Sequence, residues 1–466
     1  MRRPQTAPSR IEAEKRISPK RLYQIYSQAY IAWKDPKYFH WDDLRRRTPP
    51  VDLTHDEWWY LLKYKRFAAS KFVPLWDASR RPFSFTVPDS LVEQLHRIDC
   101  GLGSPLGVPE AVLRPESRDH YLVSTLMQES ITSSQLEGAV TTREVAKEML
   151  RSGRPPRDKS ERMILNNYLT MQRIVELRDS PLTLDLVFEI HRLVTDGTLA
   201  RTDAAGRFRR EEENVRVEDE TGEIFYRPPP AKELPDRLAA MCNFANGLSP
   251  DYFVHPVIRA IILHFWLAYD HPFVDGNGRS ARALFYWSML HGGFRLFEFI
   301  SISQVILQAP VKYAMAFLHT ETDENDLTYF ILHQADVIKR ATAALHEYVE
   351  RKTFALREAD KHLRGLGNLN HRQQALMAHA LRQPRTLYTI AAHRHSHNVV
   401  YQTAREDLLA LMRQGLLLQE KHGKKFVFRV PGDLGDKLSK LAETTPPPAT
   451  ADLTLPLNLP FVTRSD

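Results

Sequence analysis

Two apolar helical runs, at 258–269 and 283–290, enclose a turn that carries the densest cluster of functional groups in the chain. The turn, residues 271–282, has the sequence HPFVDGNGRSAR. Glycines on both sides of an asparagine let backbone N–H groups approach an anion closely. The N-terminus of the following helix adds partial positive charge at the same place. The pattern therefore predicts an anion site built on the junction of two buried helices.

The charged side chains of this turn suit a bound triphosphate. Arg279 and Arg282 lie three residues apart on a helix and can face one anion, which guanidinium groups bind in a bidentate way. Asp275 offers a hard oxygen ligand for Mg²⁺, and His271 can accept a proton near neutral pH. The structural alternative is a capping histidine beside two solvated arginines. Eight fixed positions coincide by chance in well under about one in a million chains of this length, which favours a functional site.

The turn resembles the signature of Fic-domain proteins, H-x-F-x-(D/E)-G-N-G-R-x-x-R, at every defined position. Most enzymes of that family transfer AMP from ATP to a hydroxyl group of a target protein. The resemblance implies that His271 deprotonates the attacking Tyr, Ser or Thr hydroxyl, and that Phe273 anchors the turn in the core. It also implies that Asp275 binds Mg²⁺ (or Mn²⁺) and that Arg279 and Arg282 bind the outer phosphates. The α-phosphate would be bound by Gly276, Asn277 and Gly278.

A second motif lies upstream, at the end of a helical run that extends over 118–137. The run ends in Ser133-x-x-x-Glu137, and Gly138 is a natural residue for stopping a helix. A glutamate is disfavoured at this end of a helix by the macrodipole, although an exposed side chain tolerates it. The segment resembles the inhibitory motif (S/T)-x-x-x-E-(G/N) of Fic proteins. That resemblance implies that Glu137 pairs with Arg282 and keeps the γ-phosphate of ATP out of its productive position.

An alternating segment at 213–228 predicts a β-hairpin inside an otherwise helical chain. The corresponding hairpin of Fic proteins is the flap, which docks the target segment by strand addition; the resemblance assigns this role to Ile224, Phe225, Tyr226 and Arg227. A two-stranded surface ribbon is the structural alternative. Tyr313 is a candidate neighbour of the adenine ring, and a packed core tyrosine is the competing interpretation.

Length and composition set the remaining limits. A chain of 466 residues with 43% hydrophobic and 26% charged residues is expected to form two to four globular domains. No apolar run approaches the length of a membrane span, and the basic, polar residues 1–21 lack the apolar stretch of a secretory signal. Cys100 and Cys242 cannot form a disulfide framework. These features favour a reducing, cytoplasmic setting without membrane attachment.

The C-terminal region has the pattern of a winged helix at 366–434. Helices are expected at 371–381, 386–392 and 398–414, followed by strands at 416–419 and 425–429 around a basic turn. Residues 370–440 hold twelve basic and five acidic residues, and therefore account for the whole net charge of +7. An anionic partner, most simply DNA, is one interpretation of this charge, and a solvated basic surface is the alternative; the same fold can also mediate formation of a homodimer.

The sequence thus predicts a mainly α protein: an N-terminal helical region with a disordered start (1–108), a Fic-type helical core with a small β-hairpin flap (109–360), the winged helix-turn-helix module (366–434) and a flexible tail (435–466). The predicted function is that of an autoinhibited protein adenylyltransferase, with ATP and a hydroxyl-bearing protein as substrates. Two alternatives stay open: removal of AMP by the same site, and a DNA-binding regulator whose core senses nucleotide.

Overall fold

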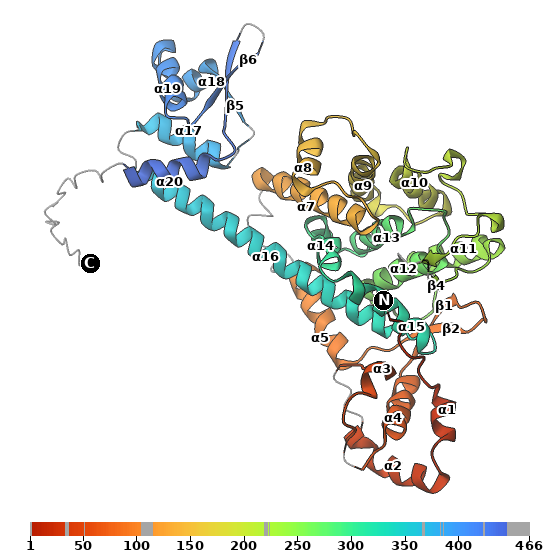
Figure 1. The fold of residues 1–466 in the computed structure, drawn as a ribbon. Coiled ribbons are helices and arrows are strands. Elements are labelled where there is room, and N and C mark those ends of the chain that lie inside the picture. The colour runs from red at the N-terminus through yellow and green to blue at the C-terminus, as the bar shows by residue number, and fades with distance from the viewer. Residues whose placement is uncertain are drawn as a thin grey trace, which may run out of the picture. The chain divides into compact units, whose positions relative to one another are not determined.

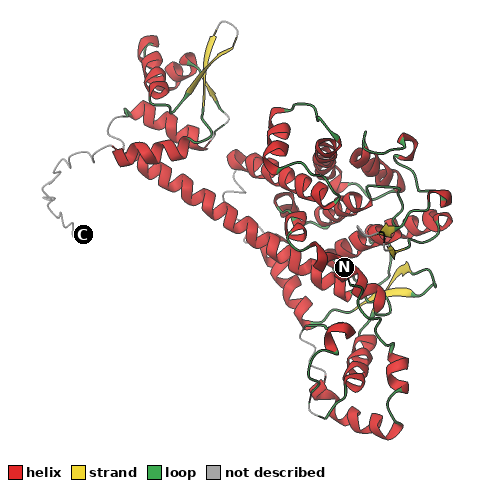
Figure 2. Ribbon diagram, viewed as in Figure 1, coloured by secondary structure: helices red, strands yellow, loops and turns green. Residues whose placement is uncertain are grey.

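The computed structural model describes residues 2–32, 37–50, 52–103, 115–218, 222, 224–365, 369–382, 384, 386–422 and 425–444. The chain divides into two compact units: Met1–Pro109 with Asp119–His346, and Glu110–Arg118 with Glu347–Asp466. The described parts are mainly helical, which confirms the predicted fold class (Figures 1 and 2). In these parts no helix has the length and apolar character that crossing a membrane requires.

The N-terminal part of the first unit packs around the fully buried Trp59. Helix α4 (His55–Ala68) begins with the capping box of Thr54 and Glu57. The predicted disordered start is wrong: helix α1 (Arg10–Lys15) has its own capping box, and its Ala13 is fully buried in the same cluster. The remaining elements here are α2 (Pro19–Ala32), α3 (Trp41–Leu44), β1 (Lys71–Trp76), β2 (Pro82–Phe85), α5 (Asp89–Ile98) and the π-helical turn η1 (Asp99–Gly103).

Strands β1 and β2 form an antiparallel hairpin that the sequence did not predict. Alternate residues of the two strands are buried, including Val73 and Phe83, but Pro74 interrupts the pattern by which a strand is recognised. The ring of Phe83 lies 5.5 Å from that of Phe265 and 4.9 Å from that of Tyr269, both on helix α12 (Pro256–Asp270). The hairpin therefore supports the helix that leads into the predicted catalytic turn.

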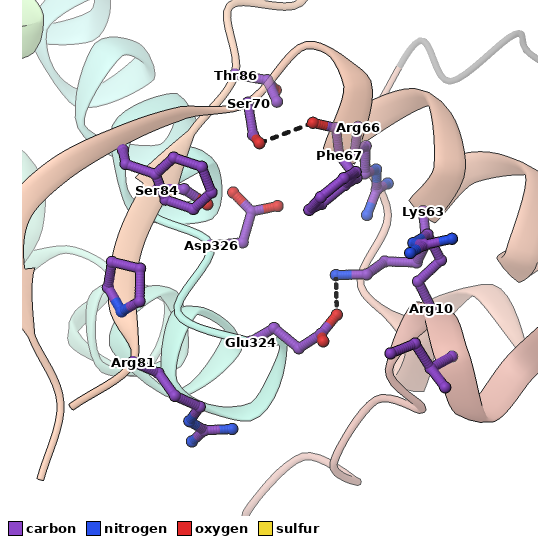
Figure 3. A pocket seen from close by; sticks show the side chains of 13 residues that line it. Arg10, Lys63, Arg66, Phe67, Ser70, Arg81, Ser84, Thr86, Glu324 and Asp326 are labelled. Atoms are coloured by element: carbon purple, nitrogen blue, oxygen red, sulfur yellow. Dashed lines mark hydrogen bonds and ion pairs between the residues drawn. The ribbon is translucent and has the colours of Figure 1, made fainter. Parts of the chain in front are cut away.

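Buried ion pairs join this N-terminal part to the loop before helix α16 (Thr328–Gly365). Lys63 lies 2.8 Å from Asp323, and the Tyr38 hydroxyl donates to Asp326 at 2.7 Å. A pocket of about 240 Å³ opens beside these charges, with Phe67 on its wall (Figure 3). Because both sides share this charged core, the predicted boundary at residue 108 does not separate two compact units.

The helices that build the predicted site lie in the rest of the first unit. The central pair is α12 and α13 (Asn277–His291), whose side chains are almost all buried. Around them lie α7 (Pro115–Leu136), α8 (Arg143–Ser152), α9 (Lys159–Glu176), α10 (Leu184–Thr195), α11 (Leu234–Ala245), α14 (Ile302–Leu307), α15 (Pro310–Thr322) and the first half of α16. Short 3₁₀ turns are η3 (Leu177–Asp179), η4 (Thr202–Ala204), η5 (Glu211–Glu213), η6 (Ala231–Glu233) and η7 (Arg295–Phe299). The predicted hairpin is present as β3 (Val217–Glu218) and β4 (Ile224–Tyr226), which pair antiparallel.

The second unit has the order helix, strand, two helices, two strands and a last helix. These are α17 (His371–Arg382), β5 (Leu387–Tyr388), α18 (Ile390–His397), α19 (Tyr401–Arg413), β6 (Leu418–His422), β7 (Lys425–Arg429) and α20 (Leu434–Thr444). The strands form one sheet in the order β5-β7-β6. Strand β5 occupies the start of the helix predicted at 386–392, and the winged helix stays a prediction.

The predicted flexible tail from residue 435 is wrong for its first ten residues. Leu434 and Leu438 of α20 are buried in the core of the second unit, against Met377 and Leu411. An apolar side chain every fourth residue makes α20 amphipathic, so it packs instead of extending into solvent. Residues 445–466 lie outside the described part of the chain.

Candidate active site

The turn after α12 is shaped by its own side chains. His271 ends the helix in the left-handed region, with φ of 44°. Phe273 is fully buried, as predicted, and its ring stacks on that of His191 with 3.7 Å between centroids. The side-chain oxygen of Asn277 accepts from the Phe273 N–H at 3.0 Å, and its NH₂ group donates to the Phe273 carbonyl at 2.8 Å. Asn277, predicted to contact phosphate, therefore uses its side chain to close the loop.

Helix α13 begins at this loop with its N–H groups directed outward. Gly276 is the N-cap, with φ of 83°, and its carbonyl accepts the first intrahelical bond from Ser280 at 3.0 Å. The N–H groups of Asn277, Gly278 and Arg279 thus precede the helical ladder. The Gly276 N–H is bonded to the Asp275 carboxylate at 2.6 Å. The predicted anion site is accordingly made by the first turn of α13.

Both predicted arginines are buried at this helix terminus. Arg279 donates through Nη1 to the Val194 carbonyl at 3.0 Å, while its Nε and Nη2 have no hydrogen-bond partner among the described residues. Arg282 donates through Nε to the Ser133 hydroxyl at 2.8 Å and through Nη2 to the Ser133 carbonyl at 2.9 Å. Burial lowers the pKa of Arg279. Two buried guanidinium groups, one with unused donors, favour an anion at this place.

The ion pair predicted between Glu137 and Arg282 is present in the structure. The Glu137 carboxylate lies 2.9 Å from Nη2 of Arg282, just beyond the last turn of α7. A β-carbon placed on Gly278 would lie 2.1 Å from Oε1 of Glu137, so the carboxylate rests on the start of α13. Burial acts to lower the pKa of Arg282, but the charge and hydrogen bond of Glu137, together with Tyr313 and Glu129, raise that pKa. The predicted inhibitory carboxylate and the predicted anion site coincide.

His271 is placed to act as a base. Its Nδ1 lies 3.3 Å from the carbonyl oxygen of Ala268, which fixes the neutral ring as the Nδ1–H tautomer and leaves Nε2 as the proton acceptor. Burial lowers the pKa of His271, against the opposing effects of the Ala268 carbonyl and the Glu137 charge. The imidazole is therefore neutral at pH 7, as a general base must be.

Asp275 lies at the open side of the site. Its side chain is 46% exposed and is 3.8 Å from Nη2 of Arg279. Mg²⁺ in nucleotide sites is held by one or two carboxylates together with phosphate oxygens and water, so a single accessible carboxylate beside an anion site fits that ion. The described residues contain no group of three His, Cys, Asp or Glu side chains that could hold a metal without such phosphate ligands.

Tyr313 lies near the site but is packed in its wall. Its hydroxyl group is 2.9 Å from Nε2 of His264, and its ring contacts Phe317 edge-on at 5.2 Å. Burial raises the pKa of Tyr313 to about 12. The Arg282 charge acts on the same hydroxyl in the opposite direction, so the tyrosine belongs to the surroundings of that guanidinium. This packing agrees with the core interpretation; contact with adenine stays a prediction.

The predicted flap is the antiparallel pair of β3 and β4, in which Val217 lies opposite Tyr226. Ile224 and Phe225 are partly exposed, while the Tyr226 ring packs against Tyr269 of α12 at 4.9 Å. Residues 219–221 and 223, part of the predicted turn, lie outside the described residues. The flap is therefore fixed to the helix that carries His271.

Two residues that the sequence did not indicate, His191 and Arg209, hold the predicted catalytic turn in place. His191 of α10 accepts the Gly206 N–H through Nδ1 at 2.9 Å and contacts the Asp275 carbonyl through Nε2 at 2.9 Å. Arg209 donates through Nε to the His271 carbonyl at 2.9 Å and through Nη2 to the Pro229 carbonyl. Neither residue stands in a recognised motif. The sequence GRFR at 206–209 offered the only signal, a change from helical to extended pattern.

The comparisons with known proteins identify the domain around this site. The model of the Fic/DOC family matches residues 181–289, which include α10, the predicted flap, the predicted catalytic turn and most of α13. These residues form a Fic domain. They make up less than a quarter of the chain.

The chain is similar to proteins named protein adenylyltransferase Fic. The one from Nematostella vectensis is 33% identical over 117 residues, 25% of each chain. The Caenorhabditis elegans protein adenylyltransferase fic-1 is 28% identical over 172 residues, 36% of this chain and 29% of the relative. The chain thus covers only about a quarter to a third of these relatives.

Solved structures of Fic proteins are also similar. A Fic family protein from Desulfovibrio desulfuricans G20 matches with a TM-score of 0.49 at 18% identity, over 74% of this chain and 97% of its own. Fic-1 from C. elegans (residues 134–508) matches with a TM-score of 0.42 at 21% identity, over 56% and 73%.

Proposed function

We propose that the protein is an autoinhibited protein adenylyltransferase. It transfers AMP from ATP to a Tyr, Ser or Thr hydroxyl of a target protein or of itself, and pyrophosphate leaves. The observation that carries the proposal is the Glu137 carboxylate on Arg282, at the start of α13. A carboxylate that occupies an anion site beside a neutral histidine points to a site for phosphates and a base. The names of the relatives support the same reaction.

In the proposed reaction each side chain acts where the structure places it. Nε2 of His271 takes the proton of the attacking hydroxyl. The N–H groups of the first turn of α13, with Arg279 and Arg282, neutralise the phosphate charge. Asp275 would hold Mg²⁺ (or Mn²⁺), which supplies further charge neutralisation when bound. Positioning and electrostatics are the main contributions that phosphoryl-type transfers take from a protein.

Inhibition follows from competition for one guanidinium. While Glu137 occupies Nη2 of Arg282, the γ-phosphate cannot use that donor. A charge-assisted hydrogen bond of ~1.5–3 kcal/mol lowers productive occupancy by roughly ten- to a hundredfold. The resting protein would therefore be nearly inactive towards its target.

Two alternatives remain from the same residues. In the first, the site removes AMP from a modified target, and Glu137 orients the attacking water. In the second, the Fic core binds nucleotide without transferring it and regulates the C-terminal module. The contacts of the site fit both alternatives, but the second leaves His271, a neutral and partly buried base, without a use.

The test is AMP transfer from ATP labelled on the α-phosphate, in the presence of Mg²⁺ and read by autoradiography and mass spectrometry of the chain itself. Glu137→Gly is expected to raise labelling by at least tenfold over wild type, and His271→Ala to abolish it in that background. Glu144→Gly removes an exposed carboxylate of α8 as a matched control and should leave labelling unchanged. If Glu137→Gly labels no more than His271→Ala, the proposed transfer and its inhibition are both wrong.

We also propose that the second unit binds an anionic partner, most simply DNA. The first turns of α19 expose Tyr401, Gln402 and Arg405, residue types that contact bases and phosphates. The affinity for a DNA duplex should fall as the salt concentration rises. Arg405→Ala should make the dependence of the binding constant on salt less steep, by the amount that corresponds to about one lost phosphate contact. Arg413→Ala, at the other end of α19 and paired with Glu406, is the control. Indifference to salt would instead favour a protein partner, including a second copy of the chain.

A further inference from the structure

The segment 206–230, which carries the flap, is fastened to the catalytic turn by buried groups at its start. Gly206 donates its N–H to His191, whose other ring nitrogen lies on the Asp275 carbonyl. Because Nδ1 accepts, Nε2 carries the proton and donates to that carbonyl. Phe208 packs edge-on against Phe188 at 4.9 Å. The beginning of the segment therefore follows the catalytic turn closely.

Arg209 makes the most direct connection. Its own N–H donates to the Pro272 carbonyl at 2.8 Å, and its Nε donates to the His271 carbonyl at 2.9 Å. Its Nη2 donates to the carbonyl of Pro229, three residues after the flap strand β4. One planar guanidinium thus touches both the catalytic histidine and the far end of the flap.

The chemistry of this contact is unusual for a buried arginine. The side chain is largely buried, with the residue 6% exposed, and the salt bridges of the described residues include none to Arg209. Burial lowers the pKa of its guanidinium. The hydrogen bonds of this guanidinium go to main-chain carbonyls, and the nearby Glu211 and Asp270 offset only part of the cost of burial, since its pKa stays lowered. What the rigid fork does supply is a fixed spacing between the atoms that it bonds.

We propose that Arg209 is a positioning residue that sets the distance between the flap and His271. The inference rests on the proposed transferase function. A target segment docked on β4 presents its hydroxyl to Nε2 of His271, and the guanidinium of Arg209 keeps the two in register. A displacement of about 1 Å between reacting groups costs on the order of a hundredfold in rate. ATP binding depends on the start of α13, which Arg209 does not touch, and should not change.

The experiment compares Arg209→Gln and Arg209→Lys in the Glu137→Gly background. Both substitutions are expected to lower the rate constant of self-labelling by roughly ten- to a hundredfold relative to Glu137→Gly alone. The dissociation constant for ATP should stay within about twofold of its value in Glu137→Gly. Lysine keeps the charge but not the planar fork, so full activity of Arg209→Lys would overturn the proposal. A parallel loss of ATP affinity in both variants would also overturn it, because it indicates general damage to the site.

Arg259 provides the matched control. It also donates one guanidinium to two main-chain carbonyls, those of Phe244 and Ser249, and burial also lowers its pKa. It lies in the first turn of α12, remote along the helix from His271. Arg259→Gln should leave the labelling rate constant within about twofold. An equal loss in this variant would show that the effect does not depend on contact with His271, and the positioning role would be wrong.

A second readout needs no catalysis. Amide hydrogen exchange of Ile224–Tyr226 should become faster in Arg209→Gln and stay unchanged in Arg259→Gln, because only the first variant frees the flap from the catalytic turn. If Glu137→Gly transfers no label, the proposed function is wrong. The exchange measurement still tests whether Arg209 couples the flap to the catalytic turn. Unchanged exchange in Arg209→Gln would overturn the coupling even if the transferase activity is confirmed.

Discussion

Gly278 has no side chain, and the space that a β-carbon would occupy is filled by the carboxylate of Glu137. A β-carbon there would lie 2.1 Å from Oε1 and 2.8 Å from Cδ. The glycine is helical and not at positive φ, so alanine suits its backbone. The flexible glutamate must then move. The absence of a side chain at Gly278 is therefore a requirement of the Glu137–Arg282 pair.

We expect Gly278→Ala to break the Glu137–Arg282 pair without activating transfer, because its β-carbon fills space that the carboxylate shares with the predicted phosphate site. In the Glu137→Gly background the same substitution should lower self-labelling, because the β-carbon then meets the phosphates of ATP. The two substitutions and their combination form a double-mutant cycle in which the activation by Glu137→Gly is lost when Gly278→Ala is added. Activation by Gly278→Ala in the wild-type background would show that the phosphates do not use this space.

The pH dependence of transfer reports on His271. Burial lowers its pKa, so the neutral base persists below the ordinary histidine value of 6.5. Glu137 opposes that shift, and its removal lowers the pKa further. The labelling rate constant of Glu137→Gly should therefore stay level from pH 8 down to 6.5 and fall only at lower pH. A midpoint above pH 6.5, with the fold intact by circular dichroism, would exclude a lowered pKa for this base.

The residues of the turn could be predicted because their spacing is itself the signal. His271, Asp275 and the two arginines occupy fixed positions in one segment, and the structure places them at one helix terminus. Arg209 and His191 could not be found in this way. Their partners are main-chain atoms of residues up to 84 positions away, and a carbonyl acceptor leaves no mark in the sequence.

Helix α7 is held to the core by contacts other than the Glu137–Arg282 ion pair at its C-terminal end. Glu129 accepts from the Ser301 hydroxyl at 2.8 Å, and from the Ser303 N–H at 3.0 Å and hydroxyl. This carboxylate caps the N-terminus of α14, where the helix dipole favours negative charge. The predicted inhibitory helix is therefore a fixed part of the unit, and relief of inhibition is expected to involve its last turn.

Glu129→Ala should destabilise the first unit by about 2–3 kcal/mol, because it leaves a buried N–H and two hydroxyl groups without their acceptor. Urea unfolding followed by circular dichroism measures the change in the free energy of unfolding. Glu176→Ala removes an exposed carboxylate that pairs with Arg173 and should have no measurable effect. Equal stability of both variants would mean that Glu129 does not anchor the helix.

The elements that were predicted well have strong local signals. Thr54 and Glu57 form a capping box that their spacing encodes, and Pro310 begins α15, where a proline at the first helical position is favoured. The hairpin of β1 and β2 was missed because its pairing depends on burial against α12, which no local pattern encodes. The short helix expected at 386–392 begins later, at Ile390, since Leu387 and Tyr388 pair with β7 from forty residues further along. Long-range contacts overrode local preference in both cases.

At the scale of the whole first unit, burial of histidines links stability to pH. Burial lowers the pKa of His40 and His264 to about 3, and of His191 and His333 to about 4; His271 and His319 are lowered as well. The unfolded chain binds protons at these rings below pH 6.5, whereas the folded chain does not. Buried carboxylates oppose this effect in smaller number: burial raises the pKa of Asp270 to about 6 and of Glu321 to about 7, and raises that of Asp326.

The sign follows from this balance: unfolding takes up protons between pH 6.5 and 4, so the free energy of unfolding should fall as the pH is lowered through this range. Each proton contributes a slope of about 1.4 kcal/mol per pH unit. His191→Gln removes one titrating ring, while the glutamine amide can still donate and accept hydrogen bonds at that position. The free energy of unfolding of this variant should therefore depend less steeply on pH, by about 1.4 kcal/mol per pH unit. His96→Gln, an exposed histidine of α5, is the control and should keep the wild-type slope. Urea unfolding at half-unit pH steps measures both, and stability that rises on acidification would show that the buried carboxylates dominate.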